Sequence, residues 1–185
     1  MELRTPVCSV RSYRPEDAVS LARNGDNRKV WLNLRDRFPH PFGVADGARY
    51  IADVLARPQE TSFAIAVGEE AVGGISLRLG TDIERVTAEL GYWIGEPYWG
   101  RGLASAAVEA VTPYGFEAFG LRRIFAIPFV ENVASCRVLE KAGYVREGLM
   151  RASAIKDGEI RDQYLYARIS GDAGGAARSA RGARV

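Results

Sequence analysis

Hydrophobic residues along the chain follow two spacings, one typical of strands and one typical of helices. Apolar side chains that recur every second residue predict strands at 10–15, 63–67, 72–79, 88–94 and 121–130. Between these segments, apolar residues recur at intervals of three and four, the spacing of one helical face. The pattern predicts a protein in which strands and helices are mixed.

Helical spacing begins at Ala18 and is expected again in 44–56, while 30–40 is interpreted as a helix followed by an irregular loop. A longer apolar stripe runs from Leu103 to Ala118, and Pro113 is expected to kink this helix or end its regular part.

A last helix is predicted at 133–142, with Asn132 as its cap and Gly143 as its left-handed terminator. Two turns predict β-hairpins. Gly68-Glu69-Glu70 separates two of the alternating segments, and Lys156-Asp157-Gly158 separates 151–155 from 160–169.

Length and composition limit the architecture. A chain of 185 residues is long enough for one buried core, so we expect residues 1–170 to form a single domain. Residues 171–185 contain only Gly, Ala, Arg, Ser, Asp and Val and predict a disordered tail.

Charge and cysteine content exclude several classes of function. A net charge of +2 is too small to indicate a nucleic-acid partner, and no apolar run is long enough to span a membrane. The N-terminal residues contain no secretory signal, so a cytoplasmic protein is expected. Cys8 and Cys136 lie far apart in the sequence and support neither a disulfide framework nor a metal site.

The most informative segment is a glycine loop between a predicted strand and a predicted helix. The strand stops at Pro97, and Gly100 and Gly102 precede the helix that starts at Leu103. Glycines allow the backbone to approach an anion, and the unpaired N–H groups of a first helical turn attract it. The loop predicts a phosphate-bearing ligand, although two glycines alone are often only a strand-to-helix turn.

The order strand, glycine loop, helix, strand, helix over 89–144 resembles the acyl-CoA-binding core of the GNAT superfamily of N-acetyltransferases. The pyrophosphate loop of that family reads Gln/Arg-x-x-Gly-x-Gly/Ala, and here Trp99 occupies the Gln/Arg position. The segment Tyr-Trp-Gly-Arg-Gly resembles the branch that acetylates the N-terminal residue of ribosomal proteins. The resemblance covers most of residues 9–169.

The resemblance implies a fold, a co-substrate and a set of site residues. The fold is a mixed, mostly antiparallel, twisted sheet of about seven strands flanked by helices, whose central strands splay apart to form the acetyl-CoA cleft. Homodimers are common in the resembled branch, and no metal is implied. The residues expected to bind acetyl-CoA are Trp93, Ile94, Gly100, Arg101, Gly102, Leu103, Ala104, Ser105, Asn132 and Ser135.

Two residues carry catalytic expectations from the same resemblance. Glu89 corresponds to a strand carboxylate that serves as general base through water, and Ser135 can lie near the sulfur and protonate the leaving thiolate. Without the family context, Glu89 reads as an ordinary strand carboxylate and Asn132 as a simple helix cap.

The resemblance also implies direct attack by a neutral amine in a ternary complex, and no Cys-His nucleophile pair is apparent. Pro97 and Pro128 predict that pairing between the two central strands fails toward that end. His40 could touch the acceptor or be a surface histidine, and its neighbours Trp31, Phe38 and Phe42 could line the acceptor site or belong to the core.

Three hypotheses for the function remain open at this stage. The first is an N-acetyltransferase that acts on a protein N-terminus or a small amine. The second is a regulatory protein that binds acyl-CoA without efficient catalysis. The third is a P-loop nucleotide-binding protein, which is the weakest because no Gly-Lys-Ser/Thr follows the glycines.

Overall fold

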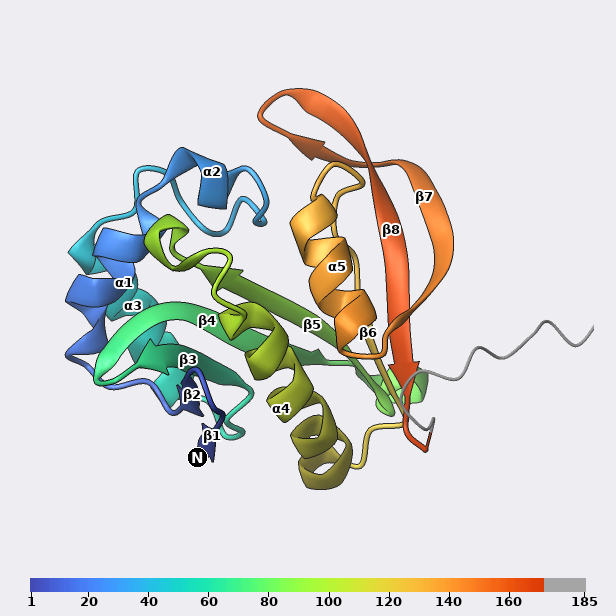
Figure 1. The fold of residues 1–185 in the computed structure, drawn as a ribbon, viewed down its shortest axis with the longest axis horizontal. Helices are drawn as coiled ribbons and strands as arrows, with labels where there is room; N and C mark the ends of the chain where they lie inside the picture. The colour runs from blue at the N-terminus through green and yellow to red at the C-terminus, as the bar shows by residue number, and fades with distance from the viewer. Residues whose placement is uncertain (172–185) are drawn as a thin grey trace, which may run out of the picture.

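A single mixed sheet of eight strands organises the computed structural model, which describes residues 1–171 (Figure 1). Its order is β1-β2-β3-β4-β5-β6-β8-β7, and within the described residues only the β5–β6 pair is parallel. The strands are β1 (Glu2–Arg4), β2 (Ser9–Arg11), β3 (Ser62–Val67), β4 (Glu70–Leu79), β5 (Thr87–Ile94), β6 (Arg123–Ala126), β7 (Val145–Lys156) and β8 (Glu159–Ile169).

Helices cover both faces of the sheet (Figure 1). The helices are α1 (Asp17–Gly25), α2 (Arg28–Trp31), α3 (Val44–Leu55), α4 (Leu103–Phe119) and α5 (Val133–Lys141), with 3-10 turns at Asp82–Glu84 and Glu96–Tyr98. The side chains of α1 and α3 pack in one buried cluster with Ala64 and Ala71, whereas α4 and α5 contribute to the larger cluster on the other face. Gly115 lets α4 approach the sheet closely, because a Cβ there would lie 2.7 Å from Leu77 Cδ1.

The two central strands separate soon after they pair. The parallel ladder of β5 and β6 contains Thr87 with Arg123, Ala88 with Ile124, and Glu89 with Phe125, and it ends there. Beyond this point β5 continues to Ile94 against β4 alone, while the chain after β6 follows β8 through a bridge between Phe129 and Gln163. The expected splay of the central strands is therefore present, and it begins before either proline.

Most sequence-predicted elements are confirmed, with boundaries that shift by a few residues. The helix expected at 44–56 is α3, and the turn at Asp157 and Gly158 has positive φ at both residues, 55° and 79°. Asn132 caps α5 by accepting the Ser135 N–H at 3.0 Å, and Gly143 has a φ of 77°.

Three details refine the sequence prediction. The sheet has eight strands where about seven were expected, because Glu2–Arg4 adds an edge strand too short for a periodic signal. The strand expected over 121–130 is regular only at Arg123–Ala126, because the chain then turns away from β5. The helix α4 does not end at Pro113 but continues to Phe119. Pro113 lies on the exposed side of the helix, so water can reach the carbonyl of Glu109 that the proline leaves without a backbone partner.

Two further expectations concern the C-terminal tail and the absence of membrane-spanning segments. Apart from Gly171, the tail expected at 171–185 lies outside the described residues. In the part of the chain that is described, none of the helices has the length and apolarity required to cross a bilayer.

Candidate active site

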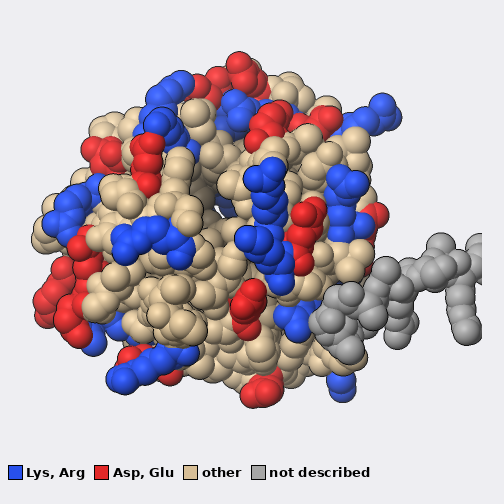
Figure 2. Space-filling model, viewed as in Figure 1, with Lys and Arg blue, Asp and Glu red and all other residues tan. Residues whose placement is uncertain are grey.

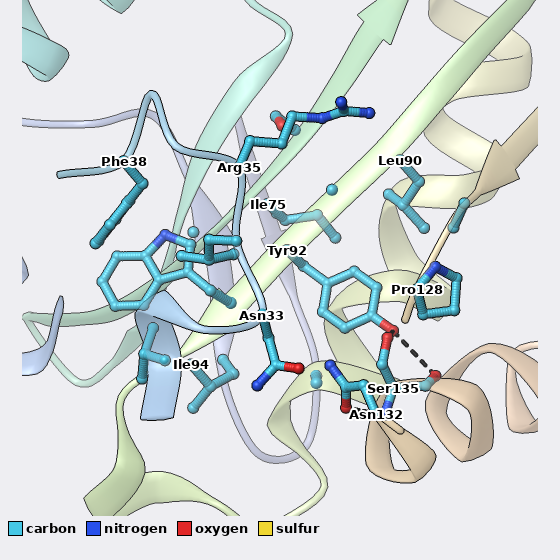
Figure 3. Close-up of a pocket in the computed structure, with 18 of the residues that line it drawn as sticks. Asn33, Arg35, Phe38, Ile75, Leu90, Tyr92, Ile94, Pro128, Asn132 and Ser135 are labelled. Carbon is cyan, nitrogen blue, oxygen red and sulfur yellow. Dashed lines mark hydrogen bonds between the residues drawn. The ribbon is translucent and has the colours of Figure 1, made fainter. Parts of the chain in front are cut away.

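A large cavity lies where β5 and β6 part. Its volume is about 1560 Å³, and it is lined by residues of β4, β5, the glycine loop, α5 and the segment between α2 and α3. Figure 2 shows the molecule hollowed near the centre of this face, with Lys and Arg side chains on both sides of the opening. Figure 3 shows side chains from distant parts of the sequence converging on the cavity.

The free edge of β5 supplies backbone hydrogen-bonding groups to this cavity. Gly95 N–H donates to Val72 and Gly80 N–H donates to Thr87 across the β4–β5 ladder, so odd-numbered residues of β5 direct their polar backbone groups toward β4. Leu90, Tyr92 and Ile94 therefore direct theirs toward the side that β6 has left. Such an edge can hydrogen-bond an extended amide-containing ligand as an additional strand would.

The glycine loop provides a concave set of N–H groups next to that edge. Gly100 and Gly102 have φ values of 73° and 78°, a left-handed conformation that glycine adopts without strain. The first intrahelical bond of α4 is Ala106 N–H to Gly102, so the N–H groups of Leu103, Ala104 and Ser105 have no helical partner. These groups and the positive end of the α4 dipole suit a phosphate.

The space outside the two loop glycines is open. A Cβ placed on Gly100 or Gly102 would meet no atom of the described residues within 4 Å. Gly100, Gly102, Ala104 and Ser105 line the cavity, while the Arg101 guanidinium lies outside the lining, 5.2 Å from the centre of the Tyr98 ring. The cavity thus fits a ligand with an anionic end at the loop and an extended amide-bearing arm along β5.

Trp99 stands where the resembled family has a polar side chain, and its role here is structural. Its indole N–H donates to the Ile94 carbonyl at 2.6 Å. This bond ties the glycine loop to the end of β5 and occupies one of the carbonyls of the free edge. This side chain therefore fixes the loop to the strand, and Trp99 also lines the cavity.

A pair of hydroxyl groups lies at the N-terminal end of α5. Tyr92 Oη lies 2.8 Å from Ser135 Oγ and 3.2 Å from the Ser135 carbonyl oxygen. Burial raises the pKa of the Tyr92 phenol above its ordinary value, so the phenol stays protonated near neutral pH. Asn132 uses its carbonyl oxygen to cap α5, and its amide NH₂ makes no hydrogen bond to any described residue and points into the cavity (Figure 3).

Glu89 lies at the last position where β5 pairs with β6, and it is only 9% exposed. Its two carboxylate oxygens form ion pairs with different guanidinium groups: Oε1 with Arg35 and Oε2 with Arg78. Arg78 is the direct cross-strand neighbour of Glu89 on β4, whereas Arg35 comes from the segment after α2. The expected general base is thus held between two arginines.

The residues predicted to bind acetyl-CoA divide between the two faces of the sheet. Ile94, the loop residues, Asn132 and Ser135 lie on the side of α4 and α5. The Trp93 side chain lies on the opposite side, 5.5 Å from Phe38 between ring centres, and its polar backbone groups face β4. Trp93 therefore belongs to the other half of the cavity, together with Glu89.

That other half is closed by the segment between α2 and α3. Phe38 and Phe42 stack with ring centres 4.4 Å apart and line the cavity, and Phe42 is also part of the buried cluster with α1 and α3. His40 stacks on Trp31 at 5.6 Å, and neither residue lines the cavity.

The β7–β8 hairpin holds this segment in place. The buried Lys156 ammonium lies 2.7 Å from Asp36 and 3.7 Å from the centre of the Trp31 ring. Arg28 pairs with Asp157 at the hairpin turn at 2.5 Å. These contacts fix the backbone on either side of Arg35, which is next to Asp36 in the sequence.

Three residues of the site were not selected from the sequence. Tyr92 could have been found, because it precedes Ile94 by two residues on the same strand and therefore shares its face. Arg78 and Arg35 carried no signal, since their proximity to Glu89 depends on hairpin register and on an irregular segment. Among residues 1–171, no group of three His, Cys, Asp or Glu is arranged to hold a metal ion.

Comparison with known proteins agrees with this geometry. Residues 9–145 match the model of the acetyltransferase (GNAT) domain. The chain is 30% identical to an uncharacterized N-acetyltransferase p20 from Bacillus licheniformis, over 90% of this chain and 95% of that protein. It is 32% identical to the ribosomal-protein-serine acetyltransferase of Escherichia coli, over 76% of this chain and 80% of that protein.

A solved structure extends the comparison to a bound ligand. Mycobacterium smegmatis RimJ in complex with CoA-disulfide superimposes with a TM-score of 0.78 at 27% identity and covers 92% of this chain and 86% of that one. The matched domain includes the free edge of β5, the glycine loop and the N-terminal end of α5. The chain therefore belongs to the GNAT family of acetyl-CoA-dependent acetyltransferases.

Proposed function

We propose that this protein transfers the acetyl group of acetyl-CoA directly to a primary amine, either the α-amine of a protein N-terminus or the amine of a small molecule. The observation that carries the proposal is the continuity of one cavity. It joins the glycine loop and the free edge of β5 to the carboxylate of Glu89 on the other side of the strand. Donor and acceptor can thus approach the same point from opposite faces of the sheet.

The residues around the cavity fit the parts of acetyl-CoA. The N–H groups of Leu103, Ala104 and Ser105 would bind its phosphates, while the backbone of Leu90 and Tyr92 and the amide NH₂ of Asn132 would bind the pantetheine arm. The thioester supplies an activated acetyl group. A backbone N–H of β5 near the thioester carbonyl would stabilise the negative charge that develops on its oxygen.

Proton transfer is assigned to the two polar groups on either side of β5. As the amine nitrogen bonds to the carbonyl carbon, Glu89 takes up its proton directly or through water. As the C–S bond breaks, the Ser135 hydroxyl gives its proton to the sulfur and regains one from Tyr92 or solvent. A thiolate with an unperturbed pKa of about 8.5 leaves more readily when it is protonated.

How much the reaction needs Glu89 as a base depends on the pKa of the acceptor amine. An α-amine with a pKa of about 8 is partly neutral at pH 7, whereas a lysine side chain near 10.4 is almost fully protonated. An α-amine therefore needs little help to lose its proton. The double ion pair of Glu89 fits such an acceptor better than it fits a lysine.

The cysteines give no support to an acetyl-enzyme intermediate. Burial raises the pKa of the thiols of Cys8 and Cys136, and the reactive form of cysteine is the thiolate. The only histidine, His40, lies outside the cavity lining and stacks on Trp31. Direct transfer needs none of these residues.

Release of free CoA thiol, measured against a panel of peptides and small amines, tests the proposal. We expect thiol release that requires an acceptor and saturates with acetyl-CoA, with one N-acetylated product per thiol. Saturable binding of acetyl-CoA without acceptor-dependent thiol release for any amine would favour the alternative, a regulatory protein that binds acyl-CoA.

A further inference from the structure

An excess of positive charge surrounds Glu89 on the acceptor side of the cavity. Arg35 and Arg78 pair with its carboxylate. Burial lowers the pKa of the Arg78 guanidinium, and the positive charges of nearby Arg35 and Arg37 lower it further. All three arginines line the cavity. Within the described residues Arg37 forms no ion pair, so the cluster keeps an excess of two positive charges.

These arginines are on the wrong face of the sheet to serve the phosphates of acetyl-CoA. Side chains alternate along β4 and β5, so Arg78 and Glu89 share the face of Trp93, opposite Leu77 and Leu90, which pack beneath α4. The glycine loop precedes α4 on that opposite side. The positive cluster therefore faces the space left for the acceptor.

The arginines are also available to a ligand. The side chains of Arg35 and Arg78 are 50% and 58% exposed, whereas the Glu89 side chain between them is 11% exposed. Each guanidinium uses one nitrogen on Glu89, and neither makes another hydrogen bond to a described residue. A guanidinium has five N–H donors in a planar fork that matches an oxyanion.

We propose that Arg35 and Arg78 bind a carboxylate of the acceptor that lies close to the amine to be acetylated. This inference rests on the proposed function and names its substrate class. The carboxylate is either the α-carboxylate of a free amino acid or an acidic side chain near a peptide N-terminus. Its arrival at the arginines releases one oxygen of Glu89, which then accepts the proton of the amine.

Matched acceptors test the proposal. L-phenylalanine and L-phenylalaninamide differ in the carboxylate, and the peptides Ala-Asp-Ala and Ala-Asn-Ala differ in a single acidic side chain. We expect kcat/KM for thiol release to be about tenfold or more higher for the carboxylate member of one pair. The pair that shows the preference identifies the source of the carboxylate.

Variants connect the preference to the arginines. Arg35→Gln and Arg78→Gln should raise the KM of the carboxylate acceptor about tenfold and leave the KM of the neutral acceptor nearly unchanged. Arg35→Lys should raise the KM of the carboxylate acceptor less than Arg35→Gln does, because lysine retains the positive charge. The recovery should be incomplete, because lysine lacks the planar fork of donors. Arg23→Gln removes an exposed arginine of α1 that pairs with Glu70 of β4, and it should change neither value.

Acceptor binding to the enzyme with CoA, measured by calorimetry, separates this inference from the proposed function. Binding that requires the carboxylate and Arg35, without thiol release, would support the oxyanion site and contradict acetyl transfer. Equal binding and turnover of the carboxylate and neutral acceptors would overturn the oxyanion site but not the proposed acetyl transfer. Equal effects of Arg35→Gln on the two acceptors of a pair would have the same meaning. Circular dichroism of each variant confirms that it is folded.

Discussion

At the residue scale, the proposed protonation of the leaving thiolate depends on one contact, between Tyr92 and Ser135. Tyr92 belongs to the part of β5 that has a free edge, and Ser135 lies on the first turn of α5, 43 residues later. Their hydroxyl groups are 2.8 Å apart, so a proton lost by Ser135 can be replaced without waiting for solvent. Neither hydroxyl group has another described side chain as a hydrogen-bond partner.

Tyr92→Phe should reduce kcat for acetyl transfer about tenfold or more at neutral pH, with little change in the affinity for CoA. The deficit should narrow as the pH rises above about 8.5, because the thiolate can then leave without a proton. Stopped-flow detection of the thiol measures kcat, and calorimetry measures CoA binding.

Tyr144→Phe is the matched control, since it removes a phenol hydroxyl bonded to Thr112 at 2.9 Å, away from the cavity. A Tyr92→Phe enzyme that keeps full kcat across the pH range would contradict the role of the hydroxyl pair.

At this scale the sequence reveals residues whose role follows from local geometry. Asn132 was predictable as a helix cap, and Gly143 as a residue with positive φ, because both roles involve only neighbours in the chain. Arg35 was not predictable, since it reaches Glu89 across 54 positions from an irregular segment. Whether Glu89 acts as the base stays a prediction.

At the scale of an element, the glycine loop also combines a local signal with a contact that the sequence does not reveal. Its two left-handed glycines turn the chain so that the first-turn N–H groups of α4 face open space, and Trp99 anchors the turn to β5. The sequence motif identified the loop, but the indole hydrogen bond depends on the three-dimensional path between Ile94 and Trp99.

Gly102→Val should weaken CoA binding at least about tenfold, because a β-branched residue is strained at a φ of 78° and its side chain would occupy the space in front of the N–H groups. Isothermal titration with CoA measures the effect.

Gly120→Val is the matched control, because Gly120 has a φ of 62° at the opposite end of the same helix and also has open space around its Cβ position. Equal losses of CoA affinity in the two variants would show that helix stability matters and that the loop itself does not.

At the scale of the whole molecule, several buried tyrosines make the free energy of unfolding depend on pH in the alkaline range. Burial raises the pKa of Tyr13, Tyr92, Tyr144 and Tyr166, and for Tyr144 it does so to about 12. Above about pH 10 the unfolded chain loses these protons while the folded protein retains them. Stability is therefore fully present below pH 10 and falls as the pH rises toward the folded pKa values.

The free energy of unfolding, obtained from urea titrations between about pH 8 and about pH 11, should decrease with pH. Each tyrosine contributes up to about 1.4 kcal/mol per pH unit, so Tyr144→Phe should make the decline shallower by about that amount. Equal slopes for the wild-type protein and Tyr144→Phe would contradict the assignment.

The whole-molecule arrangement shows where sequence reasoning ends. Hairpins and helices were predictable because their signals are local, and the resemblance supplied the splayed sheet. The insertion of β8 between β6 and β7 depends on packing between distant segments, and so does the single cavity that joins the glycine loop to Glu89. No pattern in the sequence around Lys156 predicts that its side chain is buried against Trp31 and Asp36.

Initial rates of thiol release, measured while acetyl-CoA and a reactive amine are both varied, test the central claim most directly. Direct transfer between two ligands in one cavity predicts double-reciprocal lines that intersect, and intact mass spectrometry should find no acetylated enzyme after incubation with acetyl-CoA alone. Parallel lines together with an acetyl-enzyme that passes its group to the amine would contradict the account, because direct transfer forms no covalent intermediate on a residue of the enzyme.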